Sequence, residues 1–138
     1  MRRFLMACLG VAAVLLCSCA RPQAVATSSE DPCKDAQTQA DLTRCWSRVA
    51  EQADRSLNER LREAVAQLRQ RDAGAAADLV AQAQAKWEDY RDSHCSAVSK
   101  LYEGGSVESM QRFSCRARVA DQRRNELDAM LADWGASG

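Results

Sequence analysis

The sequence predicts an all-α protein, an antiparallel three-helix bundle stapled by two disulfide bonds. Apolar residues recur at steps of three and four along three stretches of about 30 residues, and no stretch alternates with a period of two. Proline is absent after Pro32, so nothing interrupts the three stretches. At about 1.5 Å per residue, and with short turns between them, the helices would form a bundle about 45 Å long.

The predicted helices cover about residues 38–70, 75–101 and 106–134. Their apolar stripes run through Leu42, Trp46, Val49, Ala53, Leu57, Leu61, Val65 and Leu68, then Val80, Ala83, Trp87, Tyr90, His94, Val98 and Leu101, then Val107, Met110, Phe113, Ala117, Ala120, Arg124, Leu127, Leu131 and Trp134. Asp72, or the 71–74 segment around it, is expected to end the first helix. Glu-Gly-Gly-Ser at 103–106 separates the second helix from the third, with Ser106 as a candidate N-cap.

The composition excludes several classes of function. The 138 residues suffice for one domain, and 19 Lys and Arg balance 19 Asp and Glu, so the chain lacks the positive charge expected of a nucleic-acid binder. It has one histidine and neither of the glycine-rich motifs that bind nucleotide phosphates. Because no nucleophile–base pair or metal-ligand cluster is evident, we expect no enzyme activity, no cofactor, no metal site and no nucleic-acid partner.

Residues 1–18 have the pattern of a bacterial lipoprotein signal peptide. A basic start precedes an apolar run at 4–16, which is too short to span a bilayer. The sequence Leu-Cys-Ser-Cys at 16–19 then resembles a lipobox, in which Cys19 is acylated and becomes the first residue of the mature chain. The alternative is an ordinary secretory signal cleaved at a nearby alanine.

Residues 19–32 are expected to form a flexible tether, because small, polar and proline residues dominate there without apolar periodicity. The helical domain would then cover 33–134, followed by a short tail at 135–138. Ala20 after the acylated cysteine resembles outer-membrane sorting in Gram-negative lipoproteins. We therefore expect a periplasm-facing lipoprotein attached to the outer membrane through its N-terminal lipid.

Four cysteines lie in the predicted domain: Cys33, Cys45, Cys95 and Cys115. An even number in an exported chain indicates two disulfide bonds, and the absence of a CxxC pair disfavours a zinc site. All four would lie at one end of an up-down-up bundle, so topology alone leaves three pairings open. Proximity in the sequence favours Cys33–Cys45 and Cys95–Cys115, each contributing about 3 kcal/mol to a thin core.

Several motifs follow one another along the chain: C-x5-Q-x-D-L-x-x-C at 33–45, D-x-x-L-N at 54–58, Q-x-x-W-x-x-Y-R-D-x-x-C at 84–95, G-S at 105–106, Cys115 and E-L at 126–127. Together they resemble the LprI-type lysozyme-inhibitor N-terminal domain family over about residues 33–131. The resemblance implies a small helical domain of a secreted or lipid-anchored protein that binds and inhibits lysozyme without catalysing a reaction.

The signature residues are interpreted as structural: Asp54, Leu57, Asn58, Trp87, Tyr90, Arg91, Asp92 and Arg124. Because Leu57, Trp87 and Tyr90 lie on the apolar stripes, they are expected to pack in the core. His94 lies on the same stripe as Tyr90 and is expected at the core boundary rather than as a pH switch.

Asp54 is expected to form a mid-bundle pair, because an unpaired charge on an apolar stripe would be costly. Its partner is expected to be Arg124, with Arg91 as the alternative. Asn58 is expected to hydrogen-bond across the helices or to cap this network.

Two further features concern binding. Glu88, Asp89 and Asp92 fan around one helix without an evident cleft, so they are interpreted as a solvated face, or else as an acidic recognition patch, rather than as a glycosidase pair. The turn between the second and third helices offers the candidate partner-binding residues Tyr102, Glu103, Gly104, Gly105 and Ser106. An aromatic ring and a carboxylate on a preorganised turn would suit a sugar-binding cleft, whereas a plain helix–helix connection is the alternative.

The expected function is therefore a lipid-anchored envelope protein that binds and blocks lysozyme. The alternative is an adaptor for other periplasmic or outer-membrane proteins, which an exposed contiguous apolar patch would favour.

Overall fold

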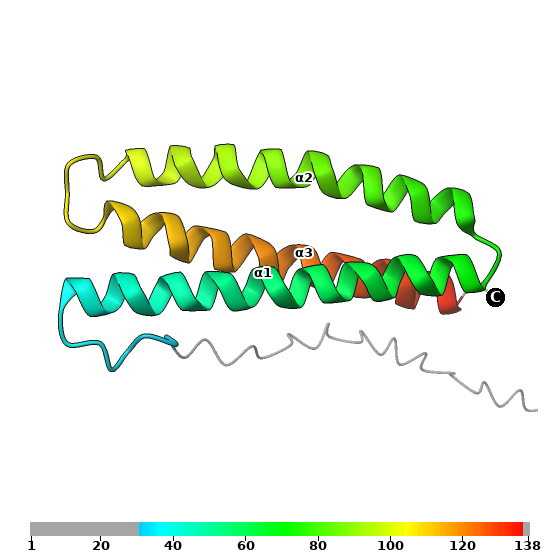
Figure 1. The fold of residues 1–138 in the computed structure, drawn as a ribbon, viewed down its shortest axis with the longest axis horizontal. Helices are drawn as coiled ribbons and strands as arrows, with labels where there is room; N and C mark the ends of the chain where they lie inside the picture. The colour runs from blue at the N-terminus through cyan, green and yellow to red at the C-terminus, as the bar shows by residue number, and fades with distance from the viewer. Residues whose placement is uncertain (1–30, 137–138) are drawn as a thin grey trace, which may run out of the picture.

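The computed structural model describes residues 31–136 and shows three helices in an up-down-up bundle (Figure 1). Helix α1 covers Gln39–Gln70, α2 covers Gly74–Lys100 and α3 covers Glu108–Ala136. No β-strand occurs within the described residues, so the predicted all-α class is confirmed. None of these helices has a stretch long and apolar enough to cross a membrane. The predicted signal peptide, the lipidation site at Cys19 and most of the 19–32 tether lie outside the described residues.

Helix α1 has a side-chain cap at its start and a left-handed residue after its end. The hydroxyl of Thr38 accepts a hydrogen bond of 3.1 Å from the Asp41 N–H and donates one of 2.6 Å to the Asp41 carboxylate. At the other end Asp72 adopts a φ of 59°, and the N–H groups of Asp72 and Ala73 donate to the carbonyls of Arg69 and Leu68. This is a Schellman motif, and the predicted break at Asp72 is confirmed.

The start of α3 differs from the prediction. The helix begins at Glu108, two residues beyond the expected N-cap Ser106. The Glu108 carboxylate accepts a hydrogen bond of 3.1 Å from the N–H of Gly104, so it fixes the preceding turn. A carboxylate in the first turn also interacts favourably with the helix dipole.

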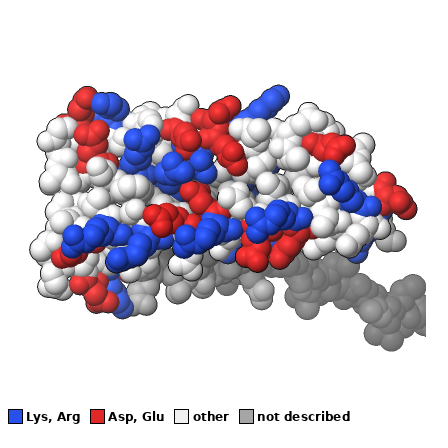
Figure 2. All heavy atoms as spheres, viewed as in Figure 1, with Lys and Arg blue, Asp and Glu red and all other residues white. Residues whose placement is uncertain are grey.

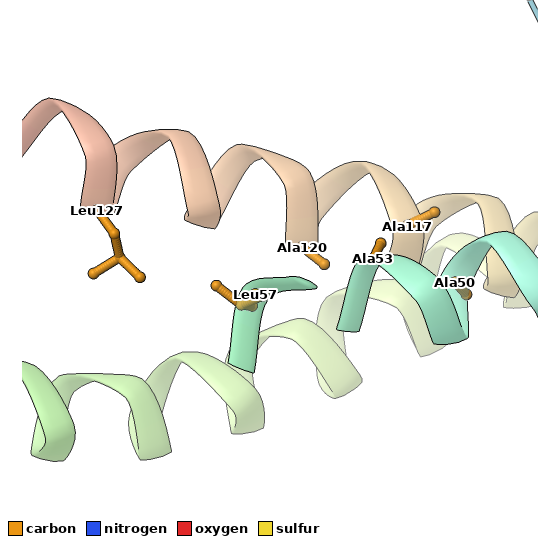
Figure 3. Close-up of a cluster of buried hydrophobic side chains, with 6 residues drawn as sticks. All are labelled: Ala50, Ala53, Leu57, Ala117, Ala120 and Leu127. Atoms are coloured by element: carbon orange, nitrogen blue, oxygen red, sulfur yellow. The ribbon is translucent and has the colours of Figure 1, made fainter. Parts of the chain in front are cut away.

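The central core lies between α1 and α3, which run in the same direction. Its buried residues are Ala50, Ala53 and Leu57 from α1 and Ala117, Ala120 and Leu127 from α3, and Figure 3 shows their side chains between the two helices. Leu57 and Leu127 are each only 1% exposed, while the alanines allow the helices to approach closely. Trp46, Phe113 and Trp87 pack around this cluster.

Two smaller clusters extend the core to the ends of the bundle. Ala64, Leu68, Ala77 and Leu131 pack at the α1–α2 turn, where the guanidinium of Arg71 lies 5.1 Å from the centre of the Trp134 ring. At the opposite end, Val119 packs with Cys95 and Cys115. The start of α1, the end of α2 and the start of α3 therefore meet at this second end (Figure 1).

Candidate partner-binding site at the disulfide-stapled end

Both predicted disulfide bonds are present, at the same end of the bundle. Cys33 pairs with Cys45, with Cα atoms 5.9 Å apart, and Cys95 pairs with Cys115, with Cα atoms 5.6 Å apart. The pairing favoured by proximity in the sequence is thus confirmed. The first bond fixes the segment before α1 to that helix, and the second joins α2 to α3 just below their turn.

The turn between α2 and α3, residues 101–106, is an exposed, internally hydrogen-bonded element that we call the 101–106 hairpin. The N–H groups of Tyr102, Glu103 and Gly105 donate to backbone carbonyls three residues earlier, at 2.9–3.2 Å. Gly104 adopts a φ of 77°, which is the left-handed region that glycine tolerates best. With the Cys95–Cys115 bond below it, this hairpin is preorganised.

Two apolar side chains project from the hairpin into solvent. Leu101 is 82% exposed and Tyr102 is 42% exposed. The predicted inclusion of Leu101 in the apolar stripe of α2 is wrong, because the helix ends at Lys100 and the chain turns away from the core there. Glu103 is exposed as well and forms an ion pair of 2.5 Å with Lys100, which holds the pKa of that lysine above its usual value. The hairpin thus offers an apolar pair beside a carboxylate.

Acidic and basic side chains are interspersed over the described residues. At the stapled end, the five acidic side chains are matched by five basic ones: Asp31, Asp35, Asp41, Glu103 and Glu108 against Lys34, Arg44, Arg48, Lys100 and Arg112. Along α1, five arginines and three glutamates are exposed: Arg44, Arg48, Arg55, Arg62 and Arg69, with Glu51, Glu59 and Glu63. Figure 2 shows basic side chains in a row over this helix, interspersed with acidic ones. Charge alone therefore does not distinguish the stapled end from α1 as a contact surface for a cationic partner.

The signature charges form a network that differs from the predicted one. Asp54 accepts hydrogen bonds of 3.1 Å from Arg91 on α2 and from Arg116 on α3. The alternative partner Arg91 is therefore confirmed, whereas the expected Asp54–Arg124 pair is wrong. Arg124 lies eight residues, about 12 Å, further along α3 than Arg116 and faces Asp121 at 3.7 Å. The sequence periodicity correctly indicates that an arginine of the third helix pairs with Asp54. It does not give the offset of α1 and α3 along their axes, which decides which arginine is level with Asp54.

Asp92 completes this network. Its carboxylate accepts from Arg91 at 2.9 Å and lies 3.3 Å from Arg116. The hydrogen bond from Arg91 holds the pKa of Asp92 below its usual value. Asp89, by contrast, is exposed, and Glu88 accepts a hydrogen bond of 3.4 Å from buried Gln84. The three carboxylates of this region are thus dispersed rather than gathered around a cleft.

The other signature residues divide between core and surface. Leu57 is buried and Trp87 packs against the core, as expected. Tyr90 is 56% exposed and stacks on the half-buried His94, with ring centroids 5.4 Å apart, so its predicted place in the core is wrong. Asn58 is exposed and hydrogen-bonds with none of the described side chains, so the predicted bond across the helices is also wrong.

Helix α2 explains the misplacement of Tyr90. Its buried residues are Ala77, Gln84, Cys95 and Ser99, of which two are polar. The apolar pattern therefore does not mark the buried face of this helix. The buried Gln84 accepts a hydrogen bond of 3.4 Å from Arg123, which satisfies its side-chain oxygen. Among the described residues, no group of acidic, cysteine and histidine side chains could hold a metal ion.

Comparisons with known proteins relate the chain to others through its sequence. The chain is 32% identical over 127 residues to an uncharacterized protein of Rhizobium meliloti (strain 1021), and the match covers 86% of this chain and 90% of that protein. No solved structure matches the chain. The family model described as lysozyme inhibitor LprI matches residues 30–127, which include both disulfide bonds, the ion-pair network and the 101–106 hairpin. The chain therefore belongs to the LprI family of lysozyme inhibitors.

Proposed function

We propose that this protein binds lysozyme and inhibits it by obstruction, with the 101–106 hairpin entering the substrate cleft. The observation that carries the proposal is the position of this hairpin within the span matched by the LprI family. Obstruction requires a rigid, protruding element and no catalytic group. The described residues supply such an element, since the Cys95–Cys115 bond joins the two helices from which the hairpin extends.

The side chains of the hairpin have the chemistry of an interface anchor. Leu101 and Tyr102 are exposed together, and aromatic residues are enriched among the side chains that dominate binding energy. Because the hairpin is already ordered, little conformational entropy remains to be lost when it binds. Glu103 adds a carboxylate beside the aromatic ring, within reach of hydrogen-bond donors in a polar cleft.

The carboxylates nearest the proposed contact are those of Glu103 and Glu108. Lysozymes of the chicken type are cationic, so acidic groups near the contact raise the association rate and select the orientation of docking. Glu103 and Glu108, which lie in or against the hairpin, would provide this steering, and Lys100 offsets part of the charge of Glu103. Inhibition is therefore expected to weaken as the salt concentration rises.

We further propose that acylated Cys19 attaches the protein to the outer membrane, facing the periplasm. The lipobox-like Leu16–Cys19 sequence and the following Ala20 support this location. A tether of about 12 residues would then separate the lipid from the bundle, which leaves the domain free to meet lysozyme that enters the envelope.

The experiment is an inhibition assay with the oxidised chain, residues 24–138, titrated into lysozyme acting on cell walls. Stoichiometric inhibition is expected, and Tyr102→Ala combined with Glu103→Ala should weaken it by about tenfold or more. Leu79→Ala is the matched control, because Leu79 is 64% exposed but lies at the opposite end of the bundle. Unchanged inhibition by the double variant would contradict the role of the hairpin, and no inhibition by the parent chain would contradict the function.

The adaptor function remains the second candidate, because one groove has an apolar lining. This groove, between α1 and α3, has a volume of about 770 Å³ and is lined by Trp46, Val49 and Ala117 with a rim that includes Arg118 and Asp121. If lysozyme does not bind, crosslinking from a cysteine introduced at Asn125 on this rim would identify the partner instead.

A further inference from the structure

A second, smaller pocket lies between α1 and α3 on the side of the ion-pair network. We call it the Phe113 pocket. It has a volume of about 310 Å³, and its apolar lining consists of Ala50 from α1 and Phe113 from α3. This volume is at the lower end of the range for small-molecule sites, about 300–1,000 Å³.

One wall of the pocket is fixed. Asp54 and Arg116 line it, and both carboxylate oxygens of Asp54 are engaged by arginines. Asp92 in turn pairs with Arg116 and Arg91, so these charges neutralise one another. This wall therefore presents oriented polar groups without a net charge.

The remaining polar groups of the pocket keep unused hydrogen-bonding capacity. The hydroxyls of Ser47 and Ser109 hydrogen-bond with none of the described residues. Arg112 uses one nitrogen for a hydrogen bond of 3.2 Å to Ser96, while Glu51 is held only by Arg55 at 3.9 Å. Two hydroxyls, a guanidinium and a carboxylate thus surround the apolar lining.

This combination selects among classes of ligand. Outside the neutralised wall, a simple anion would meet the carboxylate of Glu51, and a simple cation would meet the guanidinium of Arg112. A wholly apolar ligand would leave the serine and arginine donors without acceptors. A sugar ring fits the apolar lining, the hydrogen-bond donors and the hydrogen-bond acceptors together. Its C–H face packs on an aromatic ring, and its hydroxyls both donate and accept.

We propose that the Phe113 pocket binds a saccharide of one or two rings, with Phe113 and Ala50 under the ring and Arg112, Glu51 and the serines bonded to its hydroxyls. This site is separate from the 101–106 hairpin, and the proposal does not require that lysozyme binds. In an envelope protein the glycan of the cell wall would be the nearest source of such a ligand, and free sugars would be the other.

The test is a nuclear magnetic resonance titration of the full chain with both disulfides formed. The probes are cellobiose, the disaccharide of N-acetylglucosamine and a wall disaccharide that contains N-acetylmuramic acid, with inorganic phosphate as the anion control. Amide shifts confined to the lining of the Phe113 pocket with at least one sugar, and none there with phosphate, would support the proposal. A response to phosphate alone, sugar shifts elsewhere, or no shifts with any sugar at tens of millimolar would overturn it.

Substitutions of lining residues test whether the sugar binds in the Phe113 pocket. Arg112→Ala and Glu51→Gln are both at exposed positions, so the bundle should stay folded, and each should weaken sugar binding by about tenfold. Arg118→Ala is the matched control, because Arg118 is also exposed on α3 but lines the other groove. Equal binding by all three variants would overturn the proposal. Parallel lysozyme assays separate the two functions, since Arg112→Ala should weaken sugar binding by that amount while its inhibition of lysozyme is unchanged.

Discussion

Asp54 on α1 and Arg116 on α3 form an ion pair of 3.1 Å, and the other carboxylate oxygen of Asp54 accepts from Arg91 on α2 at the same distance. Asp92 bonds to both arginines, so the four side chains close a ring of alternating charge across all three helices. The side chains of Arg91 and Asp54 are only 12% and 23% exposed. Such a ring fixes the offset of the three helices along their axes, because ion pairs form only when their partners are level, whereas apolar packing alone is less specific.

Removal of the central carboxylate should therefore destabilise the protein. We expect Asp54→Ala to lower the free energy of unfolding by about 2–3 kcal/mol, because it leaves two partly buried guanidinium groups with only the more exposed Asp92 as a shared acceptor. Arg124→Ala should change it by less than about 1 kcal/mol, since Arg124 only faces Asp121. Urea unfolding of both variants checks this, and equal losses would contradict the ring.

The helices and disulfides could be predicted from the sequence because their signals are local. Steps of three and four located all three helices, and short loops between cysteines favoured the two bonds that are present. The partner of Asp54 could not be predicted in the same way. Arg116 and Arg124 are separated by about two helical turns, and only the tertiary packing decides which one is level with Asp54.

The prediction of which α2 residues are buried was wrong for a related reason. Gln84 is 3% exposed while Tyr90 is 56% exposed, which inverts the ordinary preference of both residue types. Gln84 is tolerated in the interior because Arg123 and Glu88 satisfy its amide. The Phe113 pocket likewise has no signal in the sequence, because its lining residues come from two helices whose alignment is set by the fold.

The central core gives a second prediction about stability. Leu127→Ala should cost about 2–5 kcal/mol, because Leu127 is 1% exposed and packs among alanines that cannot fill the space it leaves. Met130→Ala is the control, since Met130 is 37% exposed on the same helix and should cost less than about 1 kcal/mol. Thermal unfolding followed by circular dichroism checks the difference, and similar midpoints would contradict the assigned core.

The Cys95–Cys115 bond should affect both stability and inhibition. Replacing both cysteines with alanine is expected to lower the free energy of unfolding by about 3 kcal/mol, since it opens a loop of 20 residues. The loss of inhibition should also exceed the loss expected from the unfolded fraction of the protein, because the 101–106 hairpin is no longer preorganised. Assays well below the melting temperature separate the two effects, and full inhibition by the folded double variant would contradict the second.

Stability is expected to fall in acid, with Asp92 as one cause. The hydrogen bond from Arg91 lowers the pKa of Asp92 in the folded state, so its stabilising effect is present above the pKa of the unfolded chain and is lost as pH falls through the folded value. The melting temperature should therefore decline below about pH 4. Asp92→Asn should decline less steeply, whereas Asp89→Asn, at an exposed neighbour without an ion pair to the described residues, should follow the parent.

Within residues 31–136, Asp72 and Gly104 lie in turns and have a positive φ, and opposite substitutions at these two positions should have opposite effects on stability. Gly104 has a φ of 77°, so Gly104→Ala should destabilise the protein by about 1 kcal/mol. Asp72 has a φ of 59° at the end of α1, the place where glycine is usual, so Asp72→Gly should stabilise the protein by about 0.5 kcal/mol. Urea unfolding measures both changes. If Asp72→Gly destabilises the protein instead, the Asp72 side chain stabilises the α1–α2 turn by more free energy than the substitution gains by relieving the left-handed conformation.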